Sequence, residues 1–435
     1  MVVKTKIAMK KMLLLLSSLI GITASVVAQG NWQLIANTQF NFRIDDIYFT
    51  NDSVGYVGGT GNGVYKTNDR GNTWNYIAPP NIDIFRSIEF INDTIGFYGL
   101  LSSTPTMPGA LFKTTNAGIN WTQIQNMQMQ DFDGICGIAH FQNSVIAVGT
   151  YSGPAWFYRS DDAGLNWTKT NLSAFASGLV DCYMINQDTI LVSGIAESGN
   201  QQKATILKSY NGGLSWQRVF LASAPTTYCW KMFFRPNGLG LSSIEGASAI
   251  ARTTDFGSTW SEQLITNPQG MEFGAIGLLN DTLGWVSNQW GTGTWETHDG
   301  GLTWDSINSI IQNGDRMVVI DSTTALIAGA GIYKYVYNVT GIETPIVAKK
   351  IHSLQVYPNP ASQNITINAV AGTPTFGLID ILDEKGVVIK QLTRQHFIQG
   401  KTTFEISVID LPAANYKMLW RNNELFLTTD FVIIK

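Results

Sequence analysis

Thr67-Asn68-Asp69-Arg70-Gly71-Asn72-Thr73-Trp74 is the stretch of sequence that decides the fold. Its pattern is Ser or Thr, any residue, Asp or Asn, any residue, Gly, two further residues and Trp. The pattern recurs at Thr114–Trp121, Ser160–Trp167, Ser209–Trp216, Thr253–Trp260 and Thr297–Trp304. The third position holds Asp69, Asn116, Asp162, Asn211, Asp255 and Asp299, and the last holds Trp74, Trp121, Trp167, Trp216, Trp260 and Trp304. Six copies at near-equal spacing indicate an internal repeat.

The residue types of the repeat predict a hairpin turn. An Asp or Asn side chain accepts hydrogen bonds from nearby backbone N–H groups, and Gly supplies the positive φ that a tight turn needs. The Trp begins the next strand and packs its ring over the turn. We therefore interpret the six Asp/Asn positions as structural and assign no catalytic role to them.

Each copy follows three short strands. Ser87–Phe90, Ile95–Gly99 and Leu111–Lys113 precede the second copy, for example, and a fourth strand starts at its Trp. A unit of about 45 residues with four antiparallel strands is a β-propeller blade.

The two ends of the repeat region complement each other. Trp32-Gln33-Leu34-Ile35 resembles a fourth strand without the preceding turn, whereas Arg316–Ile320, Thr324–Ala328 and Gly331–Tyr335 are three strands without a fourth. The sequence therefore predicts an all-β fold with a seven-bladed β-propeller over residues 29–340, in which the N-terminal strand closes the last blade.

This repeat resembles the Asp-box, or BNR repeat, of sialidase- and xyloglucanase-type propellers. The chain is also similar to the photosystem II assembly-factor group of single propellers. The resemblance implies that the boxes lie between the third and fourth strands, on the face away from the usual ligand site. It also implies a choice between glycoside hydrolases and binding platforms.

The N-terminus has the features of a secretory signal peptide. Four lysines precede the apolar stretch Met12–Ala28, which ends in small residues, and we expect cleavage after Ala28. No later apolar run reaches the length of a membrane span, so we expect a mature chain without a transmembrane segment. Residues 1–28 are therefore predicted as a signal peptide.

A second domain follows a linker predicted over residues 341–352. Residues 353–435 contain six or seven short alternating strands, which suit a small β-sandwich. They are similar to the C-terminal sorting domain of the type IX secretion system of Bacteroidetes, on the strength of Tyr357-Pro358-Asn359-Pro360, a hairpin with Gly386, and the terminal Phe431–Lys435. The resemblance implies Sec-dependent export, handling by the type IX machinery, and a secreted or outer-membrane surface location. An ordinary accessory sandwich is the alternative.

Composition excludes several classes of function. The 28 Lys+Arg against 32 Asp+Glu leave a net charge of −4, and no basic run follows the leader, so we expect no nucleic-acid partner. The four histidines show no metal-ligand spacing, and we expect no metal or cofactor. Three cysteines are too few for a disulfide scaffold, although a link between Cys136 and Cys182 is open in an oxidising compartment.

Neither enzyme family of Asp-box propellers can be matched in full. Phe42-Arg43-Ile44-Asp45 resembles the substrate-arginine motif of sialidases, but Asp45 stands where those enzymes have Pro. Xyloglucanase-type enzymes place two carboxylates between two propellers, and one propeller is predicted here. His140 is interpreted as a core histidine rather than a base.

The loops on the face opposite the boxes carry aromatic side chains. We select as ligand-binding candidates Arg86, Tyr151, Trp230, Trp290, Phe42 and Phe85. These rings either cap the core between blades or form a platform for a glycan or a surface protein.

Aligning the inner strands predicts the lining of the central channel. One level contains Asp46, Ser87, Gly137, Cys182, Lys231, Ala275 and Asp315, and the next contains Asp45, Arg86, Cys136, Asp181, Trp230, Gly274 and Gly314. This mixture predicts neither a metal site nor a strongly charged funnel. The sequence thus favours a secreted or cell-surface binding propeller, with carbohydrate binding or protein binding on the face opposite the boxes, and with a glycoside hydrolase as the alternative.

Overall fold

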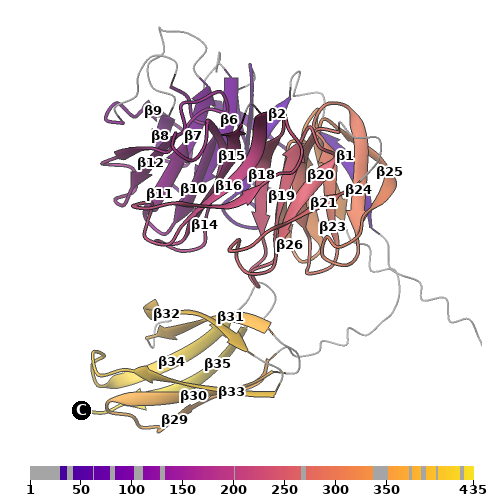
Figure 1. The fold of residues 1–435 in the computed structure, drawn as a ribbon. Helices are drawn as coiled ribbons and strands as arrows, with labels where there is room; N and C mark the ends of the chain where they lie inside the picture. Colours follow the sequence, from indigo (N-terminus) through magenta and orange to yellow (C-terminus); the bar gives the residue numbers. More distant parts are fainter. Residues whose placement is uncertain are drawn as a thin grey trace, which may run out of the picture.

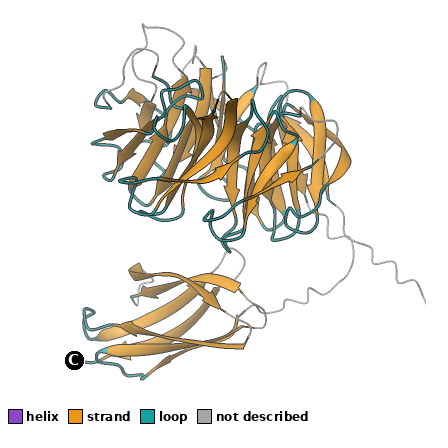
Figure 2. Cartoon of the chain, viewed as in Figure 1, coloured by secondary structure: helices purple, strands orange, loops and turns teal. Residues whose placement is uncertain are grey.

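The computed structural model of this chain describes residues 30–36, 43–61, 63–78, 84–101, 111–127, 133–199, 201–265, 271–336, 351–371, 375–383, 388–397, 400–421 and 426–435. All the regular secondary structure of these residues is β-strand, which confirms the predicted all-β class (Figure 2). None of these residues forms a helix that could span a membrane. The predicted signal peptide and most of the predicted linker lie outside the described residues.

Seven four-stranded antiparallel sheets occupy the described part of residues 30–336 (Figure 1). The first three are β2 (Ile44–Phe49), β3 (Gly55–Gly59), β4 (Gly63–Thr67) and β5 (Asn75–Ala78); β6 (Ile84–Phe90), β7 (Gly96–Leu101), β8 (Leu111–Thr114) and β9 (Thr122–Gln123); and β10 (Gly137–Phe141), β11 (Ser144–Val148), β12 (Trp156–Ser160) and β13 (Thr168–Asn171). The next three are β14 (Gly178–Met184), β15 (Ile190–Ser198), β16 (Gln201–Ser209) and β17 (Gln217–Leu221); β18 (Tyr228–Phe234), β19 (Gly240–Glu245), β20 (Ala249–Thr253) and β21 (Ser261–Leu264); and β22 (Phe273–Leu278), β23 (Gly284–Asn288), β24 (Thr292–Thr297) and β25 (Asp305–Gln312). The seventh contains β26 (Arg316–Asp321), β27 (Thr324–Ala328), β28 (Ile332–Val336) and β1 (Asn31–Ala36).

These sheets form a closed ring. The innermost strands are β2, β6, β10, β14, β18, β22 and β26, and each contacts the innermost strand of the next sheet. Strand β26 also contacts β2, so the last sheet packs against the first.

The N-terminal strand completes the seventh sheet, as predicted. Trp32 pairs with Tyr335 and Leu34 with Tyr333 in the antiparallel ladder between β1 and β28. The ring of Trp32 lies 5.1 Å from that of Trp285 and 5.5 Å from that of Tyr335, centroid to centroid. The first and last strands of the propeller, about 300 residues apart in the sequence, are thereby joined by backbone hydrogen bonds and by aromatic packing.

Each box is a turn held by its own side chains. Thr67 Oγ1 donates to Asp69 Oδ1 (2.7 Å) and accepts from the N–H of Gly71 (3.0 Å). Asp69 Oδ1 accepts from the N–H of Thr73 (2.8 Å), and Trp74 Nε1 donates to the carbonyl of Gly71 (2.9 Å). Gly71 has a φ of +79°, which a residue with a Cβ adopts only at a cost. The hydroxyl bonds to the third position and to the glycine recur in the other five boxes.

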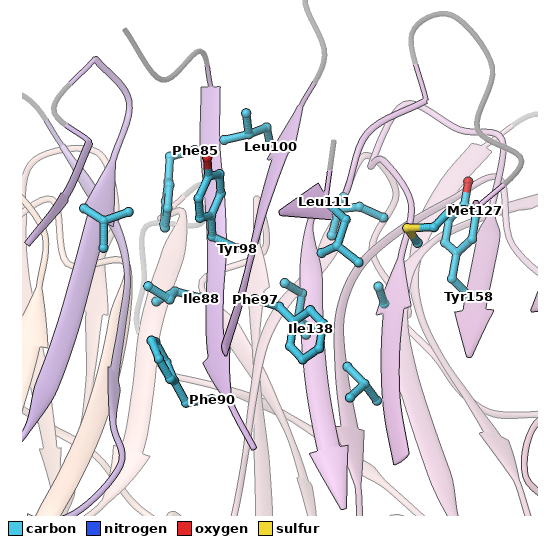
Figure 3. Close-up of a cluster of buried hydrophobic side chains, with 14 of the residues drawn as sticks. Phe85, Ile88, Phe90, Phe97, Tyr98, Leu100, Leu111, Met127, Ile138 and Tyr158 are labelled. Atoms are coloured by element: carbon cyan, nitrogen blue, oxygen red, sulfur yellow. The ribbon is translucent and has the colours of Figure 1, made fainter. Parts of the chain in front are cut away.

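The core lies between neighbouring sheets rather than in the channel (Figure 3). Phe90 of β6 stacks on Tyr56 of the preceding sheet at 3.9 Å between centroids. Phe97 of β7 meets the box residue Trp167 of the following sheet edge to face at 6.2 Å. At these two interfaces, aromatic residues therefore pack one sheet against the next.

The described residues between 351 and 435 form two further sheets. One has the order β29 (Ile351–Tyr357), β30 (Asn364–Ala371), β33 (Gly400–Ser407), and the other has the order β32 (Val388–Phe397), β31 (Thr375–Leu382), β34 (Ala414–Arg421), β35 (Phe426–Ile433). Side chains of both sheets, including Ile367 and Trp420, share one buried cluster. Asn359 holds the last strand, since its Nδ2 donates to the carbonyl of Asp430 (3.2 Å) and its Oδ1 accepts from the N–H of Val432 (2.9 Å). The predicted hairpin residue Gly386 lies outside the described residues.

Candidate functional site

The two faces of the ring differ in which loops they carry. Each box turn bonds to the turn between the first and second strands of its sheet, as where the N–H of Arg70 donates to the carbonyl of Ser53 (3.1 Å). Because antiparallel strands alternate in direction, the loops between second and third strands open on the opposite face. Tyr151 and Trp290 lie in such loops, after β11 and β23.

On this opposite face, two arginines lie against aromatic rings. We call the following residues the Arg–aromatic cluster: Arg43, Arg86, Tyr151, Trp230 and Trp290.

Trp290 is the most exposed ring of the cluster. Its side chain is 55% exposed, and the Arg43 guanidinium carbon lies 4.3 Å from its ring centroid. The loop is held by polar side chains, since Asn288 Nδ2 donates to the carbonyl of Trp290 (3.2 Å) and the N–H of Gly291 donates to Asn313 Oδ1 (2.6 Å). The ring is thus presented to solvent on a fixed backbone.

Tyr151 forms the second exposed part of the cluster. It is 40% exposed, and its ring lies 6.5 Å from Trp230 and 6.4 Å from Tyr228, centroid to centroid. Trp230 is only 6% exposed, and the Arg86 guanidinium carbon lies 4.8 Å from its ring. Tyr151 therefore stands at the surface above a buried indole–guanidinium pair.

Two buried carboxylates connect these parts. Asp315 Oδ2 accepts from Arg43 Nε (2.5 Å), while its Oδ1 accepts from Trp230 Nε1 (3.1 Å). Asp45 Oδ1 lies 3.2 Å from Arg43 Nε and 3.4 Å from Arg86 Nη1. Two guanidinium groups and two carboxylates thus balance, and the cluster presents little net charge to a ligand.

The pKa values of the acids around the cluster are shifted in different directions, because burial and the neighbouring charges oppose each other. Burial raises the pKa of Asp45 to about 6, and the nearby charge of Asp315 adds to the effect. Burial also acts on Asp315, but Arg43 and its other cationic neighbours outweigh it and hold its pKa below the usual value. Burial raises the pKa of Glu245 to about 7, although Gln289 Nε2 donates to its Oε2 at 2.7 Å. Glu245 therefore loses its proton only near neutral pH. Its hydrogen bond to Gln289, the residue before Trp290, connects it to the Trp290 loop.

A second charged group lies nearer the box side of the channel. Arg316 lies 3.3 Å from Asp46 through Nε and donates to Asp181 through Nη1 (2.9 Å). The same carboxylates accept from backbone groups of neighbouring sheets, Asp46 from Ile88 (2.9 Å) and Asp181 from Met232 (2.8 Å). These side chains link consecutive sheets around the channel.

This arrangement corrects the predicted channel lining. Cys182 and Asp315 were expected level with Asp46, but Arg316 brings Asp181 to Asp46, and Asp315 faces the other mouth. The reason is that Asp46 and Asp181 occupy equivalent ladder positions, opposite Gly58 and Ser193, whereas the prediction aligned the second strands on their glycines. The channel also carries more paired charge than the predicted mixture. Among the described residues, no three His, Cys, Asp or Glu side chains are placed to hold a metal ion.

The structure does not bring all candidate residues to the surface. Phe85 is fully buried and stacks on Tyr98, so its ring belongs to the core between sheets and is closed to a ligand (Figure 3). Phe42 lies outside the described residues. The cysteines are buried free thiols, namely Cys136, Cys182 and Cys229.

Sequence reasoning missed Arg43 and Asp315 as members of the site. Arg43 was considered only within a sialidase-like motif, and Asp315 only as part of a channel level. The signal that could have found them is the pair of acidic residues at Asp45 and Asp46 in the first blade, matched by Asp315 and Arg316 in the last. The ring closure makes these strands neighbours.

Two parts of the chain match models of known protein families. Residues 24–180 match the family model described as photosynthesis system II assembly factor YCF48, and residues 355–435 match the model described as secretion system C-terminal sorting domain. No curated protein matches the sequence. The sorting-domain match implies secretion, with the chain released or held at the cell surface.

Similar solved structures are propellers. YCF48 bound to D1 peptide has a TM-score of 0.53 at 17% identity, covering 71% of this chain and 95% of that one. YCF48 from Cyanidioschyzon merolae has a TM-score of 0.52 at 17% identity, with coverages of 71% and 98%. The GH74 xyloglucanase from Xanthomonas campestris has a TM-score of 0.54 at 12% identity, with coverages of 92% and 68%. At these identities the similarity shows the fold alone.

Proposed function

We propose that this chain, with its YCF48-like propeller domain and its secretion sorting domain, is an exported binding protein whose ligand contacts the Arg–aromatic cluster. We further propose that residues 1–28 direct Sec export, that residues 29–340 form the binding propeller, and that residues 353–435 address it to the type IX machinery across the linker of residues 341–352. The observation that carries the proposal is the exposure of Trp290 and Tyr151 on polar-braced loops.

A neutral glycan fits this surface best. Flat indole and phenol rings pack on the apolar faces of sugars, and the neighbouring guanidinium, carboxylate and amide groups can bond to hydroxyls. Since Asp45 and Asp315 already neutralise Arg43 and Arg86, the cluster does not select an anionic ligand by charge. A protein segment is the alternative, because a YCF48 with this fold was solved with a peptide.

Glycoside hydrolysis is a second candidate function, favoured by one observation. A general acid of that reaction needs a carboxyl whose pKa lies near the working pH. Glu245, with a pKa raised to about 7, meets this condition beside the Trp290 loop. The partner carboxyl would be Asp45, whose pKa is also raised.

Parallel glycan and peptide arrays test the proposal. The purified chain is applied to both beside Trp290→Ala and Tyr151→Ala variants, with Tyr76→Ala as a matched control. Tyr76 is an exposed ring on the outermost strand of another sheet. We expect a glycan signal that falls at least tenfold in both cluster variants and persists in the control.

The outcomes separate the candidates. Signals that survive both cluster substitutions contradict the proposed site, and a signal on peptides alone replaces the glycan by a protein ligand. Release of reducing sugar from an array hit, abolished by Glu245→Gln, would establish the hydrolase instead.

A further inference from the structure

A cavity of about 680 Å³ opens at the box-side end of the channel. Its lining includes the aromatic side chains of Tyr48, Tyr183 and Phe233, and Arg316 from the charged group described above. Asp52, in the turn between β2 and β3, lies on its rim. We call this space the box-side cavity; it contains no member of the Arg–aromatic cluster.

Glu89 and His140 form a hydrogen-bonded pair in this cavity. Glu89 is on β6 and His140 on β10, and Glu89 Oε1 lies 2.8 Å from His140 Nδ1. A neutral imidazole that donates from Nδ1 leaves a lone pair on Nε2. Among the described residues, neither His140 Nε2 nor Glu89 Oε2 has a hydrogen-bond partner, so the pair offers two unused acceptors. The histidine was predicted to be a core residue, and it instead lines a cavity.

The positive charges nearby are already neutralised. Arg316 bonds to Asp46 and Asp181, and Arg235 on the rim lies 3.1 Å from Asp281. Arg316 also acts on Glu89 through its charge, but its ion pairs are with Asp46 and Asp181. Burial raises the pKa of Glu89, because the carboxylate has lost solvent without gaining a full counter-ion.

We propose that the box-side cavity binds an organic ammonium ligand, with an N–H group donated to Glu89 Oε2 and with His140 holding the Glu89 carboxylate in place. An ammonium group donates hydrogen bonds and accepts none, which complements Glu89 Oε2, while His140 holds the other oxygen of that carboxylate. The aromatic side chains in the lining, Tyr48, Tyr183 and Phe233, are suited to the methylene chain and to the cation itself. The rim carboxylate of Asp52 draws a positively charged ligand toward the opening.

Isothermal titration calorimetry of the full chain tests this inference. The probe is hexane-1,6-diammonium, and the matched neutral probe is hexane-1,6-diol. We expect saturable binding of the diammonium and none of the diol. Glu89→Gln keeps the shape and the bond to His140 but removes the charge, and it should weaken binding at least tenfold. Asp52→Asn on the rim should weaken binding severalfold.

Two controls complete the design. Glu262→Gln makes the same chemical change on outer strand β21, where Glu262 bonds to Ser223, and should leave binding unchanged. Trp290→Ala disrupts the proposed glycan site on the other face and should also leave diammonium binding unchanged. Failure of the glycan proposal and failure of this one are therefore separate results.

Several results would overturn the inference. These are the absence of saturable diammonium binding, equal binding of the diol, or undiminished binding by Glu89→Gln. Loss of diammonium binding in Trp290→Ala would place the ammonium at the wrong mouth of the channel. Far-ultraviolet circular dichroism checks that each variant folds. If Glu89→Gln does not fold, Asp52→Asn on the exposed rim takes its place, and undiminished diammonium binding by that variant would contradict binding in the cavity.

Discussion

Replacing Asp315 by Asn should destabilise the propeller by about 3–5 kcal/mol, because it leaves the buried guanidinium groups of Arg43 and Arg86 to share the single carboxylate of Asp45. The Asp315 side chain is 1% exposed and accepts from both Arg43 and Trp230. An amide can still accept one of these bonds, but it cannot neutralise the guanidinium. Asp281→Asn is the matched control: Asp281 pairs with Arg235 at 3.1 Å but is 59% exposed, so its loss should cost less than about 1 kcal/mol.

Urea unfolding at pH 7, followed by tryptophan fluorescence, measures the difference. Of the thirteen tryptophans, only Trp420 lies beyond residue 340, so the signal reports the propeller. Arg43→Met and the double variant complete a cycle. If Arg43 and Asp315 stabilise each other, the double variant should cost less than the sum of the single changes. Additive costs, or an Asp315→Asn cost no larger than that of Asp281→Asn, would refute the reasoning.

Four further predictions follow from the same structure. Trp32→Ala should cost about 3 kcal/mol or more in urea unfolding, because it removes the ring that packs the seventh sheet against Trp285 of the sixth. An unchanged midpoint would deny the closure a stabilising role. Gly71→Ala should lower the melting temperature more than Gly199→Ala; both have positive φ, but an added Cβ at Gly71 meets a leucine methyl at 2.8 Å and one at Gly199 meets nothing within 4 Å, so equal losses would contradict the packing. Glu245→Gln should stabilise the chain by up to about 3 kcal/mol at pH 8 and by almost nothing at pH 4. The raised pKa means that the folded state binds the Glu245 proton more tightly than the unfolded state, so wild type loses this stability as the pH rises from 4.5 through 7. An effect of the substitution that does not depend on pH would show that the pKa is not raised. Asn359→Ala should speed amide hydrogen exchange in the final strand by about tenfold, since two hydrogen bonds to it are lost, and unchanged exchange would remove the clamp.

The architecture was largely predictable because the repeat is written in local chemistry. A Ser or Thr hydroxyl, an Asp or Asn and a Gly within five residues specify a turn without help from distant parts of the chain, as the bonds around Asp69 show. The missing partner of Trp32 was predictable by subtraction, since one end of the repeat lacked a strand that the other end possessed.

The site was less predictable because it depends on register and on contacts between blades. The prediction aligned the second strands on their glycines, but Gly58 of the first sheet is equivalent to Ser193 of the fourth and not to Gly194, so the predicted level of Asp181 was off by one. Phe85 and Tyr151 were both predicted as aromatic residues on the face opposite the boxes, yet Phe85 is buried and Tyr151 is 40% exposed. Only the packing of adjacent sheets decides between these outcomes.

The charged residues show the same limit. Asp315 and Arg43 are separated by 272 positions and meet because the ring closes. No single blade contains enough information to pair them. The box turns are thus determined by neighbouring residues in the sequence, whereas the ion pairs of the channel form only when the sheets assemble.

A crystal structure of the chain with the tightest glycan from the array tests the central claim most directly. The account predicts a sugar packed on the rings of Trp290 and Tyr151, on the face opposite the boxes. A sugar bound on the box side, or along the outer strands with both rings left free, would contradict it.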